Sequence, residues 1–318
     1  MHASRCALLM TSFALLPLSL TGCDDADGSS DGDHDHHDAG HMGNDSGTED
    51  GGEDAATSMA VSLQFAALVG ENAFACNTTF TGLGSSDSEM APLDFRFYVH
   101  DVELLNEDGD AVAVELTQDG KWQVDDVALL DFEDKSGTCA NGTTDVNSTV
   151  VGTVPVGTYS GIQFKVGVPF ELNHADVTAA DSPLNLSGLW WSWQSGYKFM
   201  RIDMTEASGE SPNVFNMHLG SVGCEKSGDG AGDPVTSCER PNRPSVVFED
   251  FDIATDTVTV DYAALVAGID LSTDGGGAPG CMSGPTDPEC AGVFEHLGVS
   301  LETGAPAAGQ TVFGIETP

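Results

Sequence analysis

The residues of this chain best suited to bind a transition metal are four histidines outside its N-terminal region: His100, His174, His218 and His296. Neutral imidazole is a good ligand for copper, nickel and zinc. In the segment 215–221, FNMHLGS, His218 alternates with apolar residues and would lie on the opposite face of a strand from them. His174 begins a loop, where ligands are easily aimed at an ion. A single histidine is also common as a structural residue, and that alternative stays open.

Aromatic residues gather in the stretch 189–200, LWWSWQSGYKFM, which contains three of the four tryptophans. In an extended strand, Trp190 would face away from Trp191 and Trp193. A large ring that also carries an N–H donor suits three different places. It could fill a core strand, form a platform on which a sugar stacks, or lie beside a metal ion.

A second group of histidines, His34, His36, His37 and His41, lies in an acidic low-complexity segment, residues 23–57. This segment has no aromatic residue, Lys or Arg, and it cannot bury enough apolar surface to offset the entropy of ordering. We expect a disordered tether. Because a flexible cluster imposes no geometry, its histidines predict weak and unselective metal binding, and the alternative is a solvated linker.

Residues 1–22 have the features of an export signal. Arg5 precedes an apolar run over 7–20, which is shorter than the about 20 residues of a membrane-spanning helix. The motif LTGC that ends at Cys23 resembles a bacterial lipobox, which implies cleavage before Cys23 and lipidation of its thiol. We therefore expect an exported, membrane-anchored lipoprotein that faces the periplasm or the cell surface. Ordinary secretion is the alternative.

Six cysteines remain after the signal and the lipidation site are set aside: Cys76, Cys139, Cys224, Cys238, Cys281 and Cys290. An even number of cysteines in an exported chain predicts disulfides. The short spacings favour Cys224–Cys238 and Cys281–Cys290, which leaves Cys76–Cys139. Metal ligation by thiolates is the alternative, although the chain has no CxxC motif.

The charge balance excludes several classes of partner. Asp and Glu number 51 against 10 Lys and Arg, for a net charge of −41. Such a surface repels nucleic acid and anionic lipid. The chain also lacks the nucleophile elbow, the zinc-protease motif, the phosphate loop and the dinucleotide fingerprint. The residues therefore give no independent reason to expect an enzyme.

The elements that must position these side chains are short strands. Alternating bulky residues occur over 61–65, 95–105, 111–116, 122–130, 158–168, 197–204, 214–219, 246–251 and 255–262, with Gly, Asn, Asp and Pro between them. Long helical periodicity is missing. The pattern predicts one all-β domain over 58–318, a disulfide-stapled β-sandwich or barrel-like fold with long loops.

Several segments, taken in order, resemble one family, the MbnP-like proteins, also called the four-Cys proteins of metallo-mystery pairs. The segments are FYV (97–99), VALLDF (127–132), GVPF (167–170), NH (173–174), SPLN (182–185), WSWQ (191–194), GYKF (196–199), HLGS (218–221), GC (223–224), CERPNR (238–243) and CMSGPTDPEC (281–290).

The resemblance implies an exported, β-rich bacterial protein that binds copper and is not itself an enzyme. It implies a partner, a di-haem protein similar to cytochrome c peroxidases and called MbnH, which oxidises a tryptophan to kynurenine. Carried onto this sequence, His174 and His218 are the expected ligands, with His100 as a further candidate. Trp191 and Trp193 are the candidates for oxidation.

Two hypotheses compete with the copper-binding protein. One is a non-catalytic carbohydrate-binding module, since sugars stack on exposed aromatics beside carboxylates and amides. The other is a structural or adhesive lipoprotein with its tryptophans in the core.

Overall fold

The computed structural model describes residues 57–318 apart from 193, 209–212 and 231. The predicted signal, the tether with its four histidines, Cys23 and Trp193 lie outside the described residues. Residues 54–318 form one compact unit. Among the described residues, no helix is both long and apolar enough to cross a membrane.

Within the described residues, the strands form a six-stranded and a ten-stranded sheet. The order in the six-stranded sheet is β20 (Phe313–Glu316), β18 (Thr257–Asp261), β1 (Ser58–Val69), β9 (Thr149–Pro155) and β6 (Glu115–Leu116), with β2 (Asn72–Ala73) paired to β1. The order in the ten-stranded sheet is β17 (Ser245–Phe248), β10 (Tyr159–Val166), β4 (Ser88–Asn106), β13 (Met200–Glu206), β14 (Val214–Leu219) and β19 (Gly280–Cys281). Also paired to β4 are β3 (Phe80–Leu83), β5 (Ala111–Ala113) and β8 (Val127–Asp131), and β7 (Gln123–Val124) pairs with β8.

Aromatic side chains pack the two sheets together. Phe65 of β1 contacts Phe164 of β10, with ring centroids 5.6 Å apart, and Phe313 of β20 contacts Phe97 of β4 at 5.9 Å. Each of these rings is buried, and full burial of such a side chain contributes about 1.5–3 kcal/mol. The predicted all-β fold is confirmed as a sandwich of two sheets.

Two predicted strands differ in detail from the structure. The run 111–116 divides, because β5 continues the hairpin with β4 whereas β6 pairs with β9 in the other sheet. The run 122–130 is a hairpin, β7–β8, whose turn contains Asp125 and Asp126. In both places the chain changes direction inside an apolar run, so alternation alone did not reveal the break.

Short elements and disulfides complete the described part of the chain. The helices are α1 (Phe170–Asn173), α2 (Tyr262–Leu265) and α3 (Cys290–His296), with a 3-10 turn η1 (Ser187–Leu189). The described disulfides are Cys76–Cys139, Cys224–Cys238 and Cys281–Cys290, as the spacing predicted. All the described helices are short, as the lack of long helical periodicity predicted, although α3 was not expected.

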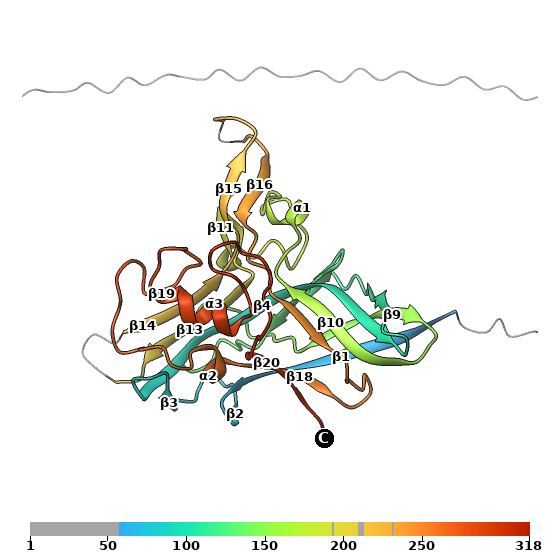
Figure 1. Cartoon of the computed structure of the whole chain (residues 1–318), viewed down its shortest axis with the longest axis horizontal. Helices are drawn as coiled ribbons and strands as arrows, with labels where there is room; N and C mark the ends of the chain where they lie inside the picture. Colours follow the sequence, from blue (N-terminus) through green and yellow to red (C-terminus); the bar gives the residue numbers. More distant parts are fainter. Residues whose placement is uncertain (1–56, 193, 209–212, 231) are drawn as a thin grey trace, which may run out of the picture. The chain divides into compact units, whose positions relative to one another are not determined.

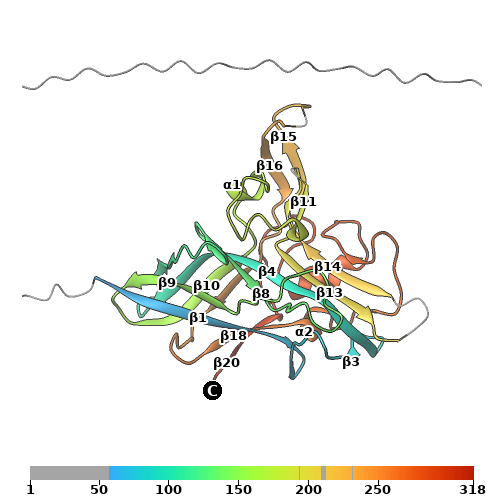
Figure 2. The same ribbon diagram turned by 180° about the vertical axis from the view of Figure 1, so that it is seen from behind.

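Two small hairpins lie on the side of the ten-stranded sheet away from β1, β18 and β20 (Figures 1 and 2). One is β11 (Trp190–Ser192) with β12 (Gly196–Tyr197), and the other is β15 (Val222–Lys226) with β16 (Val235–Arg240). Helix α1 lies beside the second hairpin. These elements bring the tryptophan segment to the outer face of the sheet.

Candidate metal centre

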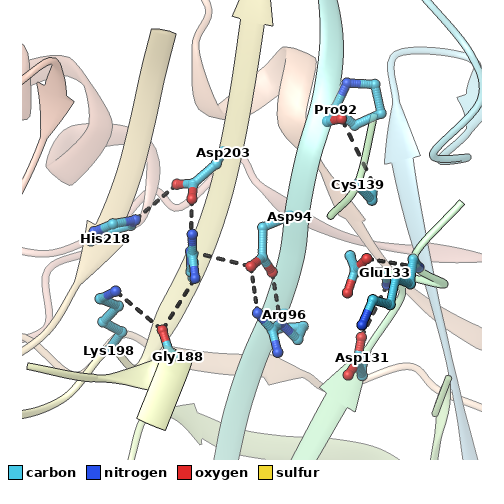
Figure 3. A network of polar contacts seen from close by, with 12 residues as sticks. Pro92, Asp94, Arg96, Asp131, Glu133, Cys139, Gly188, Lys198, Asp203 and His218 are labelled. Atoms are coloured by element: carbon cyan, nitrogen blue, oxygen red, sulfur yellow. Dashed lines mark hydrogen bonds and ion pairs between the residues drawn. The ribbon is translucent and has the colours of Figure 1, made fainter. Parts of the chain in front are cut away.

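Polar residues gather on the outer face of the ten-stranded sheet. On β4, Phe95 and Phe97 pack in the core, so Asp94 and Arg96 face the opposite way. The register sets Arg96 opposite Arg201 of β13, and Arg201 opposite His218 of β14. Asp94 likewise lies opposite Asp203, and ion pairs link these acids and bases alternately across the three strands, in the order His218–Asp203–Arg201–Asp94–Arg96 (Figure 3).

His218 is held by a buried carboxylate. Its Nε2 lies 2.8 Å from Asp203 Oδ1, and because a carboxylate only accepts hydrogen bonds, Nε2 carries the proton. Arg201 Nε binds the other oxygen of Asp203 at 2.7 Å. Burial alone would raise the pKa of Asp203, but the hydrogen bonds and charges of His218 and Arg201 outweigh it and lower that pKa. Asp203 is therefore a fixed anion behind the imidazole.

The second ring nitrogen of His218 remains available. His218 is 7% exposed, and its Nδ1 is buried with no hydrogen-bond partner in the described part of the protein. An unpaired buried polar atom is costly and calls for an explanation. A metal ion bound at Nδ1 would satisfy it, with Asp203 in the supporting role that carboxylates commonly have behind metal-binding histidines.

Trp191 lies against this histidine. The two ring centroids are 6.2 Å apart, with the planes tilted by 54°. Gly220 makes the approach possible, because a Cβ at that position would lie 2.4 Å from the Trp191 ring and 2.7 Å from Tyr197 O. Trp190 instead packs against the hydrophobic core. The two neighbouring tryptophans thus have different surroundings, as the strand alternation predicted.

A pocket of about 620 Å³ opens beside Trp191. Its lining residues are Trp191, Ser192, Gln194, Ser195, Ser221, Val222, Gly223, Cys224, Ala278 and Met282. Ser283 ties the Met282 segment to His218, since its hydroxyl donates to His218 O at 2.9 Å and accepts from Gly220 N at 3.0 Å. The disulfide Cys281–Cys290 staples the same segment to α3.

His174 lies near the same pocket through a disulfide. It ends helix α1 and is 7% exposed. Its Nε2 lies 3.4 Å from Cys238 Sγ and 3.2 Å from Asn173 Nδ2. Cys238 is bonded to Cys224, which lines the pocket. These sulfurs cannot act as thiolate ligands while they form a disulfide, so His174 is the member of this cluster that could hold a metal ion.

His100 lies in a different cluster. It is 3% exposed on β4, and burial, together with the charges of Arg243 and Lys165, lowers its pKa to about 4, which Asp101 partly opposes. The potential metal ligands grouped with His100 are Asp101 and Asp126. Among the described residues, no group of three or more potential ligands contains two of the candidate histidines. His296 Nδ1 lies 2.9 Å from Leu265 O, and a contact of this kind with the backbone is typical of a structural histidine.

Sequence reasoning missed the residues that support these histidines. Asp203 lies in a strand of alternating residues, MRIDMTE, and nothing in that pattern indicates which histidine it will face. Gly220 and Ser283 gain their roles from contacts between segments that are distant along the chain. The side chains present nevertheless suit copper, because a neutral, oriented imidazole with an unpaired nitrogen is a good copper ligand.

Comparisons with known proteins find one family that is similar in sequence and in fold. The sequence signature of the MbnP family matches residues 58–283. Among solved structures, MbnP from Methylosinus trichosporium is similar, with 34% sequence identity and a TM-score of 0.75 over 82% of this chain and 99% of that one. No curated protein matches the chain.

Proposed function

The chain belongs to the MbnP family, and from this premise we propose that it is an exported, lipid-anchored copper-binding protein that is not itself an enzyme. The observation that carries the proposal is His218, whose Nδ1 is buried and unpaired while Nε2 is held by Asp203. Family membership supports a copper-associated role.

His218 and His174 would hold the ion. Asp203 fixes the tautomer of His218 so that the lone pair of Nδ1 points away from the carboxylate. Arg201 keeps Asp203 ionised and is itself paired with Asp94, at 3.2 Å from its Oδ2. His174 contacts Cys238, whose disulfide partner Cys224 lines the pocket beside Trp191. Imidazole ligands suit both oxidation states of copper.

Trp191 is the tryptophan that we propose for oxidation to kynurenine. Both Trp190 and Trp191 are half-buried, but Trp191 lines the open pocket whereas Trp190 packs against the hydrophobic core. The partner would be a di-haem protein similar to cytochrome c peroxidases, with a peroxide as oxidant. Two equivalents of peroxide would each transfer one oxygen atom and be reduced to water, and the C2–C3 bond of the indole would break to give N-formylkynurenine. One water would then hydrolyse the formamide and release C2 as formate. The aniline nitrogen and carbonyl of kynurenine would lie beside His218 as additional metal ligands.

A carbohydrate-binding role would use the same pocket but fits it less well. Gln194, the amide beside Trp191, already donates to Cys224 O at 2.6 Å. One face of the Trp191 ring meets Gly220 and His218, so that face is closed to a sugar. Binding to glycans without binding of copper would favour this second function.

Copper titration of the full chain tests the ligand assignment. The tether histidines are first replaced (His34→Ser, His36→Ser, His37→Ser, His41→Ser), so that copper bound by the tether does not hide the folded site. In this background we expect His218→Gln to weaken Cu(I) binding at least 100-fold in a chelator competition, and His174→Gln to weaken it less. His296→Gln is the matched control, because its ring binds Leu265 O away from the pocket.

Two measurements test the remaining parts. Peptide mass spectrometry of protein made with and without the di-haem partner should find kynurenine at Trp191 only when the partner is present, and Trp191→Phe should remove it. Cys23→Ser should release the protein from the membrane fraction.

Undiminished copper binding in the double variant His174→Gln/His218→Gln would overturn the assignment of these two histidines as copper ligands.

A further inference from the structure

A second set of potential ligands surrounds His100, on β4. One ligand atom each of His100, Asp101 and Asp126 lie within 4.8 Å of one another. We propose that these three residues form a second metal site, separate from the copper site, that takes a divalent transition-metal ion of the Zn²⁺ or Mn²⁺ type. The inference does not depend on the proposed copper function, because the two sites share no residue.

His100 is the observation that points to a ligand. It is 3% exposed, and in the described part of the protein neither of its ring nitrogens has a hydrogen-bond partner. Its Nδ1 lies 3.5 Å from Asp101 Oδ2, which is too far for a normal hydrogen bond. Burying an imidazole without satisfying either nitrogen costs about 1–3 kcal/mol. A metal ion between the ring and the carboxylates would remove this cost.

The fold brings the two carboxylates to His100 from different strands. In the antiparallel pairing of β4 and β8, Val99 lies opposite Ala128. The same register, continued past the end of the ladder, sets Asp101 opposite Asp126 in the β7–β8 turn. Asp101 has a φ of +48° and lies where the β4–β10 ladder is irregular. Such irregularities re-aim side chains beside functional sites.

The local charges favour a cation. Asp101 and Asp126 place carboxylate oxygens within 4.8 Å of one another, and the charges of Asp125 and Glu171 also act on Asp126, so these carboxylates repel one another when no cation lies between them. Lys165 competes for the site through Asp101 Oδ2 at 2.8 Å. That ion pair is solvent-exposed, and exposed pairs contribute only about 0–1 kcal/mol, so a divalent ion can displace the ammonium.

The ligand set selects the kind of ion. One imidazole and two carboxylates offer nitrogen and hard oxygen donors with no sulfur, which suits Zn²⁺ or Mn²⁺ better than Cu(I). Metal–ligand distances of about 2.0–2.2 Å require the three atoms to approach one another slightly. Asp101 and Asp126 are exposed, and Asp101 would turn toward the imidazole once the ion displaces Lys165. Their exposure also gives the ion a path from solvent.

Zinc titration of the full chain, again with the four tether histidines replaced, tests the proposal. Calorimetry should find one Zn²⁺ equivalent that is lost in His100→Gln and weakened at least 10-fold in Asp126→Asn. The exposed Asp126 variant keeps the test valid should His100→Gln fail to fold. Asp125→Asn is the matched control, because it makes the same charge change in the same turn and should bind Zn²⁺ like the parent.

Two outcomes would overturn the second site. One is an unchanged zinc stoichiometry and affinity in Asp126→Asn. The other is loss of the zinc equivalent in His218→Gln instead, which would assign the ion to the copper site. Retention of copper binding in Asp126→Asn together with loss of zinc would support two separate sites. If no copper bound to the parent protein, the zinc titration would still decide the second site, because the two sites share no residue.

Discussion

His218 of β14 and His100 of β4 are buried in the same sheet, but their surroundings differ. His218 gives one nitrogen to Asp203, whose side chain is 3% exposed and held by Arg201. His100 has no such support, and its nearest carboxylate, Asp101, is 42% exposed. The first imidazole is oriented by a buried anion, whereas the carboxylate beside the second is solvent-exposed and paired with Lys165. Burial of the histidine alone therefore does not distinguish the two proposed sites, and the exposure of the neighbouring carboxylate does.

Replacement of Asp203, the carboxylate that supports His218, should have the largest effect. Asp203→Asn removes the anion that orients His218, and loss of such a partner lowers metal affinity about 10–100-fold. It also removes one of the two carboxylate partners of Arg201, and because Arg201 stays paired with Asp94, we expect a stability loss below the ~3–5 kcal/mol of a fully unpaired buried charge. Copper competition and thermal unfolding measure the two effects.

Asp101→Asn makes the same change beside His100. Because Asp101 forms only an exposed ion pair with Lys165, we expect a loss of at most about 1 kcal/mol and unchanged copper affinity. Equal copper affinities in Asp203→Asn and Asp101→Asn would show that Asp203 does not position a ligand.

Gly220→Ala tests how the packing of Trp191, which contacts His218, affects stability and oxidation. The added methyl would overlap the Trp191 ring, and overpacking of this kind costs about 1–3 kcal/mol. We expect lower stability and less kynurenine when the partner is present, with Zn²⁺ binding unchanged. Urea unfolding and peptide mass spectrometry measure these effects.

Gly188→Ala is the control for this variant. A Cβ there has only ordinary contacts, at 3.8 Å from Arg96 and Arg201. If Gly188→Ala lowered kynurenine formation as much as Gly220→Ala does, the packing of Trp191 against Gly220 would not be the cause.

Asp131 of β8 offers the most specific change, because its variant alters a pH dependence. Burial, with help from Asp94 and Glu133 and against the effect of Arg96, raises its pKa to about 7. The folded protein therefore holds a proton that the unfolded chain releases near pH 4, so stability falls as the pH rises from about 4 to 7. Asp131→Asn should remove this slope.

Urea unfolding across this pH range measures the effect of Asp131→Asn. Asp134→Asn makes the same charge change at a site where Ser136 lowers the pKa, and it should keep the slope of the parent. A slope that persists in Asp131→Asn would mean that other groups carry the pH dependence.

Much of the fold could be predicted from local patterns. Alternation located most of the strands, and cysteine spacing predicted the three disulfides. Strand β9 was missed because its small and β-branched residues lie in a Thr- and Gly-rich region without a bulky pattern. Helix α3 was missed because seven residues are too few for helical periodicity to be evident.

The sequence by itself determined which side chains are available for chemistry and which face of a strand each occupies. The alternation around His218 sufficed to separate it from Phe215 and Met217, and the order of the tryptophans sufficed to separate Trp190 from Trp191. Only the tertiary structure decided which of these groups meet. Asp203 reaches His218, and Asp126 reaches His100, through the register between strands. Register depends on packing of the whole sheet, and a shift of one residue would move every side chain to the other face.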